Sequence, residues 1–316
     1  MPLVESLDGV AVCVVTCRRP EGLARLLDAL ARLEVPGEAK VRFVVVDNDP
    51  STETARAVVE GWRHRLPGPL IYAREPRPGV SQARNAALGL AAPAPLVAFI
   101  DDDETPEPDW LGRLLACRRR TGAVAISGPV RPRFDAGVPT WLAATFGLCY
   151  VRPKPGRPVG ELQSNNLLLD RCYLEREGLA FDDRLGGQGG EDTQLGNAIK
   201  ARGGRLGWCD DAVVHEHITA ERARLAWLLR RWMRLGGTEI VLAGMAKPAA
   251  RARLQGLVRG GTRVLAGSAW LLGTLPQLVA GNAEPAVRRL YTVMRGVGMI
   301  LAACGYIRHD YGPAAR

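Results

Sequence analysis

Several common signatures are absent from this 316-residue sequence. No stretch repeats with the period of a collagen, a heptad coiled coil or a solenoid, which excludes fibrous and repeat architectures. None of the seven cysteines forms a CxxC pair, so we expect reduced thiols in a cytosolic protein. The N-terminal segment MPLVESLDG has no basic region, so no signal peptide is expected.

Three nucleotide-binding or hydrolase motifs are also missing. The first apolar run is not followed by GxGxxG, and neither GxxxxGK[ST] nor GxSxG occurs. A dinucleotide-binding fold, a P-loop nucleotidase and an α/β-hydrolase are therefore unsupported. Polar residues interrupt the apolar stretch 264–281, and the stretch 296–307 has only 12 residues. Neither is the uninterrupted run of ~20 residues that a transmembrane helix needs.

The composition is that of a folded protein with an uneven charge. Apolar residues make up 47% and charged residues 24%, which permits a full core and excludes a mainly disordered chain. The net charge of +9 gathers in residues 218–316, where 15 basic residues face 4 acidic ones. A near-neutral domain thus carries a basic extension. Such an extension suits anionic lipid, phosphate-bearing substrates or nucleic acid.

Apolar runs typical of buried strands alternate with amphipathic segments typical of helices in the first 110 residues. The predicted strands are 10–16, 41–46, 70–73 and 96–100, and the predicted helices are 21–33, 51–62 and 81–90. This alternation predicts a doubly wound, mostly parallel α/β sheet. Further along we expect strands within 123–130, 161–169 and 213–217, a helix over 191–202 and an irregular loop over 134–160.

The chain therefore divides into a predicted α/β domain, 1–217, and a basic helical extension, 218–316. Within the extension, 222–234 mixes Leu and Trp with five Arg, which is typical of an amphipathic helix at a membrane surface. A structural cap with solvated arginines is the alternative.

Four acids, Asp101-Asp102-Asp103-Glu104, directly follow the apolar run LVAFI. Carboxylates crowded at the end of a buried strand repel one another, and a divalent cation would neutralise them. Their hard oxygen atoms suit Mg²⁺ or Mn²⁺, which in turn bind diphosphate. In an open α/β sheet, ligands bind beyond the carboxyl ends of the strands. The alternative is a solvated acidic loop in which Asp103 or Glu104 caps a helix that starts near Pro106.

Two later motifs carry candidate chemistry. Gly189-Gly190-Glu191-Asp192 opens a predicted helix, where an acid can serve as a general base or simply favour the helix N-terminus. His215 and His217 alternate along a predicted strand and are candidate metal ligands, although a histidine pair without metal is the usual case.

Smaller features lie at the same predicted rim of the sheet. They are Thr16 with Arg18 and Arg19, the run Asp47-Asn48-Asp49, and Arg84 within a helix. Each is unremarkable alone, and Arg84 could equally be a surface arginine. Their shared placement gives them weight.

Taken in order, these segments resemble the inverting glycosyltransferases of family 2, which have the GT-A fold. The matching runs are VCVVTCRRP, VVVDNDPS, SQARNAAL, VAFIDDDETPEPDWL, NNLLLDRCYL and FDDRLGGQGGEDTQLGNAIKARGGRLGWCDDAVVHEH. They cover residues 9–217, and their details are most similar to bacterial glucosyltransferases of succinoglycan-type exopolysaccharide synthesis. The sequence departs from the family at DNDPS, which stands in place of the commoner DDGS.

The resemblance implies a role for each site residue. Asp192, with Glu191 beside it, is the catalytic base. Nucleotide-sugar contacts fall to Thr16, Arg18, Asp47, Arg84, Asp101 and Asp102. The implied ligands of a divalent metal, Mn²⁺ or Mg²⁺, are Asp103, Asp101, His215 and His217.

The implied reaction is a single displacement that inverts the sugar donated by a nucleotide diphosphate, expected to be UDP. The expected acceptor is a glycan or a polyprenyl-linked sugar, and the expected location is the cytoplasmic face of the inner membrane, bound peripherally to anionic lipid. The alternative location is the soluble cytoplasm.

Two other functions are the alternatives to this one. A sugar-1-phosphate nucleotidyltransferase would need a glycine loop after the first strand, whereas Gly260-Gly261-Thr262-Arg263 lies in the basic extension. A basic nucleic-acid-binding protein would need a positive groove with stacking aromatics, whereas the sheet rim is acidic, so no nucleic acid is expected.

Overall fold

Two compact units make up the chain in this computed structural model, which describes residues 9–37, 39–135, 137–150, 153 and 159–307. The described residues within 1–131 and 151–216 form the first unit. Those within 132–150 and 217–310 form the second. The domain boundary at 217/218 stays a prediction.

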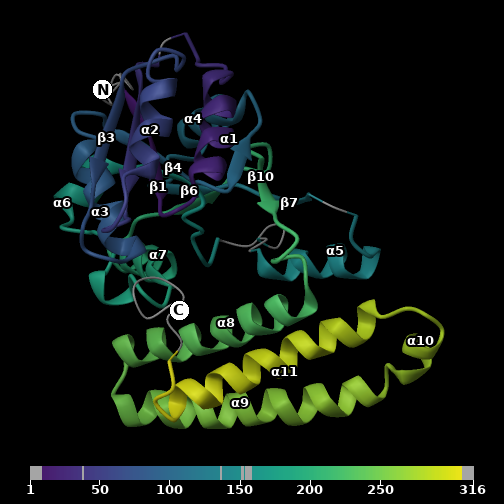
Figure 1. Cartoon of the computed structure of the whole chain (residues 1–316). Helices are drawn as coiled ribbons and strands as arrows, with labels where there is room; N and C mark the ends of the chain where they lie inside the picture. Colours follow the sequence, from purple (N-terminus) through teal and green to yellow (C-terminus); the bar gives the residue numbers. More distant parts are fainter. Residues whose placement is uncertain (1–8, 38, 136, 151–152, 154–158, 308–316) are drawn as a thin grey trace. The chain divides into compact units, whose positions relative to one another are not determined.

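The first unit is built on a seven-stranded sheet with the order β3-β2-β1-β4-β8-β6-β9 (Figure 1). Its parallel half contains β1 (Val10–Thr16), β2 (Val41–Asp47), β3 (Leu70–Arg74) and β4 (Leu96–Asp101). The helices that connect and follow these strands are α1 (Pro20–Ala31), α2 (Thr54–Trp62), α3 (Val80–Leu90) and α4 (Trp110–Thr121). Nearly every residue of β1 and β2 is buried, because helices cover both faces of such a sheet. The predicted doubly wound, mostly parallel α/β fold is confirmed.

The other half of the sheet changes direction. β8 (Asn166–Asp170) runs antiparallel between β4 and β6 (Ala125–Ser127), and β9 (Leu206–Trp208) pairs parallel with β6. α6 (Arg171–Arg176), η2 (Asp183–Leu185) and α7 (Glu191–Ala201) join these strands. A second sheet has the order β5-β10-β7, made of β5 (Glu104–Pro106), β10 (Val214–Ile218) and β7 (Val130–Phe134).

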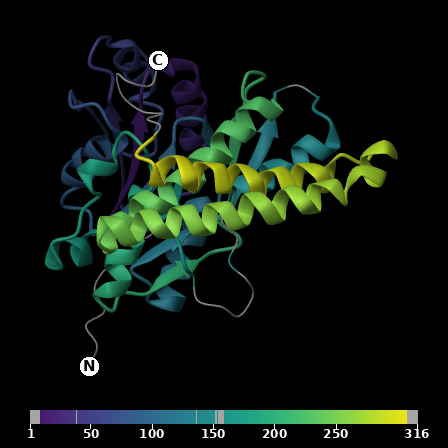
Figure 2. The same ribbon diagram turned by 90° about the horizontal axis from the view of Figure 1, so that it is seen from below.

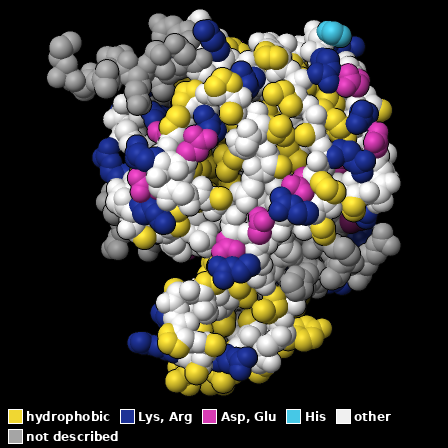
Figure 3. All heavy atoms as spheres, turned by 90° about the vertical axis from the view of Figure 1, so that its left-hand side faces the viewer, with side chains coloured by type: hydrophobic (Ala, Val, Ile, Leu, Met, Phe, Trp, Pro, Cys, Tyr) yellow, Lys and Arg dark blue, Asp and Glu magenta, His cyan; other side chains and the backbone are white. Residues whose placement is uncertain are grey.

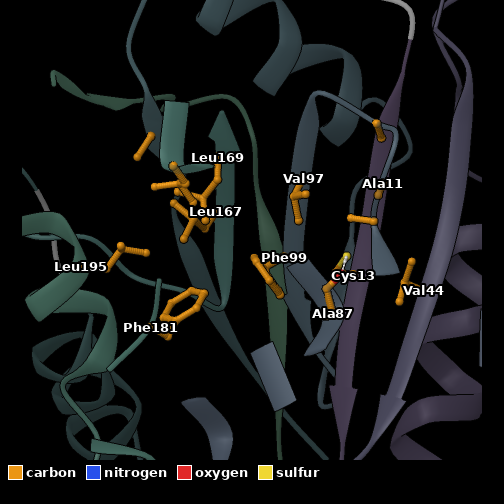
Figure 4. Packing of buried hydrophobic residues seen from close by; sticks show 14 of the residues in the cluster. Ala11, Cys13, Val44, Ala87, Val97, Phe99, Leu167, Leu169, Phe181 and Leu195 are labelled. Carbon is orange, nitrogen blue, oxygen red and sulfur yellow. Dashed lines mark hydrogen bonds between the residues drawn. The ribbon is translucent and has the colours of Figure 1, made fainter. Parts of the chain in front are cut away.

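The core of the first unit joins both halves of the sheet. Figure 4 shows Cys13 of β1 beside Val44 and Ala87, and Phe99 of β4 between that group and the Leu167–Leu169 side. The rings of Phe99 and Phe181 meet edge to face, with centroids 5.7 Å apart. This packing fixes β4, and therefore the acidic segment that follows it. The seven cysteines form no disulfide with one another, and Cys17, Cys172 and Cys304 are exposed.

The second unit is helical. Its elements are α5 (Thr140–Phe146), η1 (Gly147–Cys149), α8 (Leu225–Ala246), α9 (Ala249–Leu272), α10 (Leu275–Val279) and α11 (Glu284–Ala303). Figure 2 shows α9 and α11 running side by side along their length. Glycines permit this close approach: a Cβ atom added at Gly260 would lie 2.8 Å from the carbonyl oxygen of Gly296. Gly260-Gly261-Thr262-Arg263 thus lies inside a helix and forms no phosphate-binding loop.

The structure corrects four expectations of local structure. Segment 134–160 contains α5, although 136, 151–152 and 154–158 lie outside the described residues. The expected strand 123–130 is two strands, β6 and β7. α4 starts at Trp110, because the residues near Pro106 form β5 instead. α2 starts at Thr54, because Asp49 accepts hydrogen bonds from Ser51 and Thr52 and holds them in the preceding turn.

The amphipathic segment 222–234 does not present its apolar side to the surroundings. Leu228 and Trp232 of α8 are 0% exposed and pack with Leu142, Phe146 and Val287 inside the second unit. Their apolar area therefore stabilises this unit and is not open to lipid. Among the described residues, no helix combines the length and the apolar character needed to cross a membrane.

Candidate active site

The carboxyl ends of the central strands bring the predicted residues to one edge of the first sheet. In the pairing register Thr16 lies opposite Asp47, and Val15 lies opposite Asp101. Asp47 is in turn paired with Arg74 of β3. This edge is where an open α/β sheet binds its ligands.

The acidic segment after β4 is held by groups from β1 and α1. Thr16 Oγ1 donates a hydrogen bond to Asp102 Oδ2 at 2.8 Å, and Arg19 Nη1 reaches Asp102 Oδ1 at 3.0 Å and Asp103 Oδ2 at 2.9 Å. Gly22 of α1 leaves room for this turn, since a Cβ atom there would lie 2.7 Å from the Asp102 carbonyl oxygen. The Asp102 carboxylate therefore makes hydrogen bonds inside the turn, whereas Asp103 is more accessible than Asp102.

Burial makes the charged state of this segment costly. Burial raises the pKa of Asp102 to about 6, with Arg19 opposing the shift and the charge of Asp103 adding to it. Glu104 is 1% exposed, and burial together with Asp101 and Asp103 raises its pKa well above the ordinary value. Glu104 Oε1 accepts a hydrogen bond from Asn165 Nδ2 at 2.7 Å.

The two acids after β2 have different surroundings. Asp49 accepts hydrogen bonds from Thr52 and Ser51 and pairs with Arg18 at 3.1 Å. Burial alone would raise the pKa of Asp49, but these hydrogen bonds outweigh it and lower the pKa. Asp47 accepts hydrogen bonds from the Asp49 amide and from Tyr72 Oη, each at 3.0 Å. The Asp49 carboxylate is therefore engaged in hydrogen bonds within the loop, whereas Asp47 is the acid that lies opposite Thr16.

Arg84 connects the two acidic motifs, which are far apart in the sequence. Its guanidinium is 5% exposed, lies 3.1 Å from Asp101 Oδ1 and forms a second ion pair with Glu191 Oε1. Arg84 is thus not the surface arginine that the sequence left open. Because one buried cation contacts both motifs, the end of β4 and the start of α7 lie on either side of it.

The start of α7 separates the two acids of the GGED motif. Gly190 has φ 95°, a left-handed conformation that lets the chain turn into the helix. Glu191 is 5% exposed and paired with Arg84, and burial raises its pKa although Arg84 opposes the shift. Asp192 is partly exposed and accepts hydrogen bonds from the backbone amides of Thr193 at 2.6 Å and Ser164 at 3.4 Å.

The predicted histidines have carboxylate neighbours of their own. His215 Nε2 lies 3.3 Å from Glu107 Oε1, and His217 Nδ1 lies 3.9 Å from Asp135 Oδ1. Across the described part of the chain, no three His, Cys, Asp or Glu side chains are placed to hold a metal ion together. The structure therefore brings Asp101 and Asp103 to one turn without gathering a histidine into a ready-made site with them. Two carboxylates still fit a magnesium-type ion, since such ions take one or two carboxylates and complete their shell with water and phosphate oxygens.

Three contributors to the site had no role predicted from the sequence, although Arg19 was placed at the same rim. Arg19 was visible beside Arg18, but its contacts with Asp102 and Asp103 depend on how α1 begins. Tyr72 lies on β3, and its hydroxyl reaches Asp47 only through the β2–β3 register. Ser164 supplies a backbone amide, which leaves no signal in the sequence.

Comparison with known proteins identifies the family of the chain. Residues 11–173 match the profile described as glycosyl transferase family 2. The chain is 39% identical over 232 residues to succinoglycan biosynthesis protein ExoM of Rhizobium meliloti (strain 1021), covering 72% of this chain and 73% of that protein. It is 35% identical over 226 residues to validoxylamine A glucosyltransferase of Streptomyces hygroscopicus subsp. limoneus, covering 61% of this chain and 48% of that protein.

Solved structures share the fold. Mannosyltransferase PcManGT from Pyrobaculum calidifontis, in complex with GDP-Man and Mn²⁺, superimposes with a TM-score of 0.65 at 23% identity, covering 94% of this chain and 86% of that one. S. aureus TarS 1-349 in complex with UDP gives a TM-score of 0.51 at 16% identity, covering 92% and 89%. The fold and the site define a glycosyltransferase of the GT-A type. The chain belongs to glycosyl transferase family 2.

Proposed function

We propose that this glycosyltransferase inverts the sugar that it moves from a nucleotide diphosphate, UDP, to a hydroxyl group of a glycan or polyprenyl-linked acceptor. The observation that carries the proposal is the bridge made by Arg84 between Asp101 and Glu191. It sets the acidic end of β4, suited to a diphosphate, beside the start of α7, which holds a partly exposed carboxylate. Sugar transfer needs the group that binds the diphosphate and the base that activates the acceptor to lie close together.

The nucleotide end of the proposed site is formed by the ends of β1 and β2. Thr16 and Asp47 lie opposite each other there, and Arg18 reaches across to Asp49 and so joins the two loops. We assign Asp47 to the base of the nucleotide. Arg84 and Asp102 would then act mainly by holding the acids that meet the donor, since both side chains are buried in contacts within the protein.

The diphosphate end is assigned to Asp101 and Asp103. When bound there, Mn²⁺ or Mg²⁺ would offset the negative charge that develops on the leaving diphosphate. Both carboxylates are partly exposed, the Asp101 side chain at 37% and the Asp103 side chain at 18%, and Arg19 pairs with Asp103. His215 and His217 remain proposed ligands only, because each has a carboxylate neighbour of its own.

Asp192 is the proposed general base. It removes the proton of the acceptor hydroxyl while that oxygen attacks the anomeric carbon opposite the leaving group. One carbon–oxygen bond forms as the bond to the diphosphate breaks, and UDP leaves with the bonding electrons. A single displacement of this kind inverts the anomeric centre. Glu191 is unsuited to the role because it is buried and paired with Arg84.

The biological setting is proposed from the relative. ExoM is described as a succinoglycan biosynthesis protein, and we extend exopolysaccharide synthesis to this chain. A lipid-linked acceptor would be met at the membrane, and the basic extension supports peripheral attachment to anionic lipid on the cytoplasmic face.

A panel of nucleotide sugars tests the proposal. Purified full-length protein is incubated with Mn²⁺, each donor and a polyprenyl-linked acceptor, and the released nucleotide is measured. Release of UDP from one donor, with the opposite anomeric configuration in the product, is expected. Release of pyrophosphate would instead indicate a nucleotidyltransferase, and no turnover with any donor would contradict the proposed donor class.

A further inference from the structure

The exposed apolar surface of this protein is concentrated in one unit. Among the described residues, every large hydrophobic side chain that is strongly exposed lies between 245 and 307. Figure 3 shows such side chains, with Lys and Arg beside them, on the face of the helical unit turned to the viewer. Contiguous exposed apolar surface of this kind marks an interaction site more often than scattered single residues do.

Helix α9 carries a continuous part of this surface. Its exposed residues Leu254, Val258, Leu265 and Leu272 are 62%, 59%, 75% and 68% exposed. Their spacing of four, seven and seven residues places them on one side of the helix. We call these four residues the α9 outer stripe.

The α9 outer stripe is separate from the side of α9 that packs against the rest of the unit. The buried residues of α9 are Ala252, Gly256, Gly260 and Gly267, and they lie on the opposite side of the helix. Added Cβ atoms at Gly256 and Gly260 would contact Met299 and Gly296 of α11. Packing within the unit therefore uses the small-residue side and leaves the leucine side outward.

Positive charge accompanies the stripe. Residues 240–283 contain no Asp or Glu but include Lys247, Arg251 and Arg253, all exposed, whereas Arg259 pairs with Glu239 of α8 at 3.9 Å. A second copy of the same face would bring like charges together, which opposes self-association. An anionic lipid surface offers hydrocarbon for the leucines and negative charge for the arginines.

The tip after α9 continues the same character. Leu275, Leu278 and Val279 are 52%, 47% and 88% exposed, and Arg289 lies over the Trp270 ring at 4.8 Å from its centroid. Tryptophan with an adjacent arginine is typical of the boundary between lipid head groups and hydrocarbon.

We propose that the α9 outer stripe and the tip around Trp270 lie flat on an anionic bilayer, with the axis of α9 in the membrane plane. The inference rests on the membrane attachment in the proposed function and assigns it to a face. The proposed membrane-binding face is therefore not the apolar side of α8, whose Leu228 and Trp232 are buried inside the unit. The occupant is lipid, and the leucines enter only the head-group boundary, because no described helix can cross the bilayer.

The test compares two triple variants of the full chain. Leu254→Ser, Leu265→Ser and Leu272→Ser remove the apolar side chains, and Leu→Met at the same positions keeps them. Each protein is sedimented with vesicles of equal parts phosphatidylcholine and phosphatidylglycerol. We expect the serine variant to lose roughly a hundredfold in partitioning, since each buried leucine contributes apolar area. The methionine variant should bind like the wild type.

A charge variant and two readouts complete the experiment. Arg251→Gln with Arg253→Gln should weaken binding to these vesicles roughly fivefold per residue removed. Melting curves confirm that the variants are folded, and UDP binding in detergent reports on the nucleotide site separately. Undiminished vesicle binding by the folded serine variant would overturn the proposal even if glycosyl transfer is established. A wild-type dimer that the serine variant converts to a monomer, without vesicle binding, would assign the stripe to a second copy instead.

Discussion

Glu191 and Asp192 are neighbours in the chain, but their surroundings give them different tasks. Glu191 is buried against Arg84, whereas Asp192 is partly exposed and held by two backbone amides. We predict that Asp192→Asn lowers kcat by ~10²–10⁴-fold, because the acceptor proton has no base, and leaves UDP affinity nearly unchanged. Stopped-time assays and calorimetric UDP titration measure the two quantities. An equal loss of UDP affinity would place Asp192 in the nucleotide site instead.

Asp103 is a partly exposed acid in the turn after β4. We predict that Asp103→Asn abolishes measurable turnover, because the diphosphate loses the carboxylate that would anchor its cation. Treating the wild type with EDTA should have the same effect, and Mn²⁺ should restore activity to the wild type only. Full turnover in the variant, or in the chelated enzyme, would show that the acidic turn has another purpose.

Asp102 illustrates the cost of crowding acids in a buried turn. Its pKa in the folded state, about 6, lies above the ordinary 3.8, so the folded state binds this proton more tightly than the unfolded chain does. For an acid with a raised pKa, stability is highest at low pH and falls as the pH rises from 3.8 through 6. Asp102→Asn should therefore stabilise the protein at pH 7 by roughly 3 kcal/mol at most, with a gain that disappears near pH 4. Denaturant titrations in EDTA at both pH values test this, and a gain that does not change with pH would point to a different cause.

At the scale of secondary-structure elements, the sequence predicted the strands whose burial is visible in a short run of apolar residues. The valine-rich β1 and β2 are buried on both faces, so their residues alone mark them as central strands. α5 escaped prediction because its seven residues lie among Pro and Gly, and its stability comes from contacts of Leu142 and Phe146 with Leu228 and Trp232. The pairing of Arg84 with Glu191 joins residues 107 positions apart, which no local pattern encodes.

The contact between α9 and α11 offers a prediction with a matched control. A Cβ atom at Gly260 would press on the Gly296 backbone, whereas one at the adjacent Gly261 would meet nothing within 4 Å. Gly260→Ala should destabilise the helical unit by ~1–3 kcal/mol, since the helices must separate. Gly261→Ala should stabilise it by up to ~1 kcal/mol, because alanine is the better helix former. Thermal melts compare them, and equal melting temperatures would show that the helices are not in close contact at Gly260.

Among the described residues of the whole molecule, one core cluster lies around Phe99 in the sheet-containing unit and another lies around Trp232 in the helical unit, and the two share no residue. Domains with their own cores commonly unfold as separate cooperative units. We therefore predict two transitions in calorimetry of the full chain. UDP with Mn²⁺ should raise the melting temperature of the sheet-containing unit only. At a hundredfold excess over the dissociation constant, the ligand adds ~2.7 kcal/mol to the free energy of unfolding of that unit. Gly260→Ala should lower only the other transition, which assigns the two without cutting the chain. A single transition that both the ligand and the substitution shift would mean that the two cores are coupled, and that changes in the helical unit reach the nucleotide site through stability.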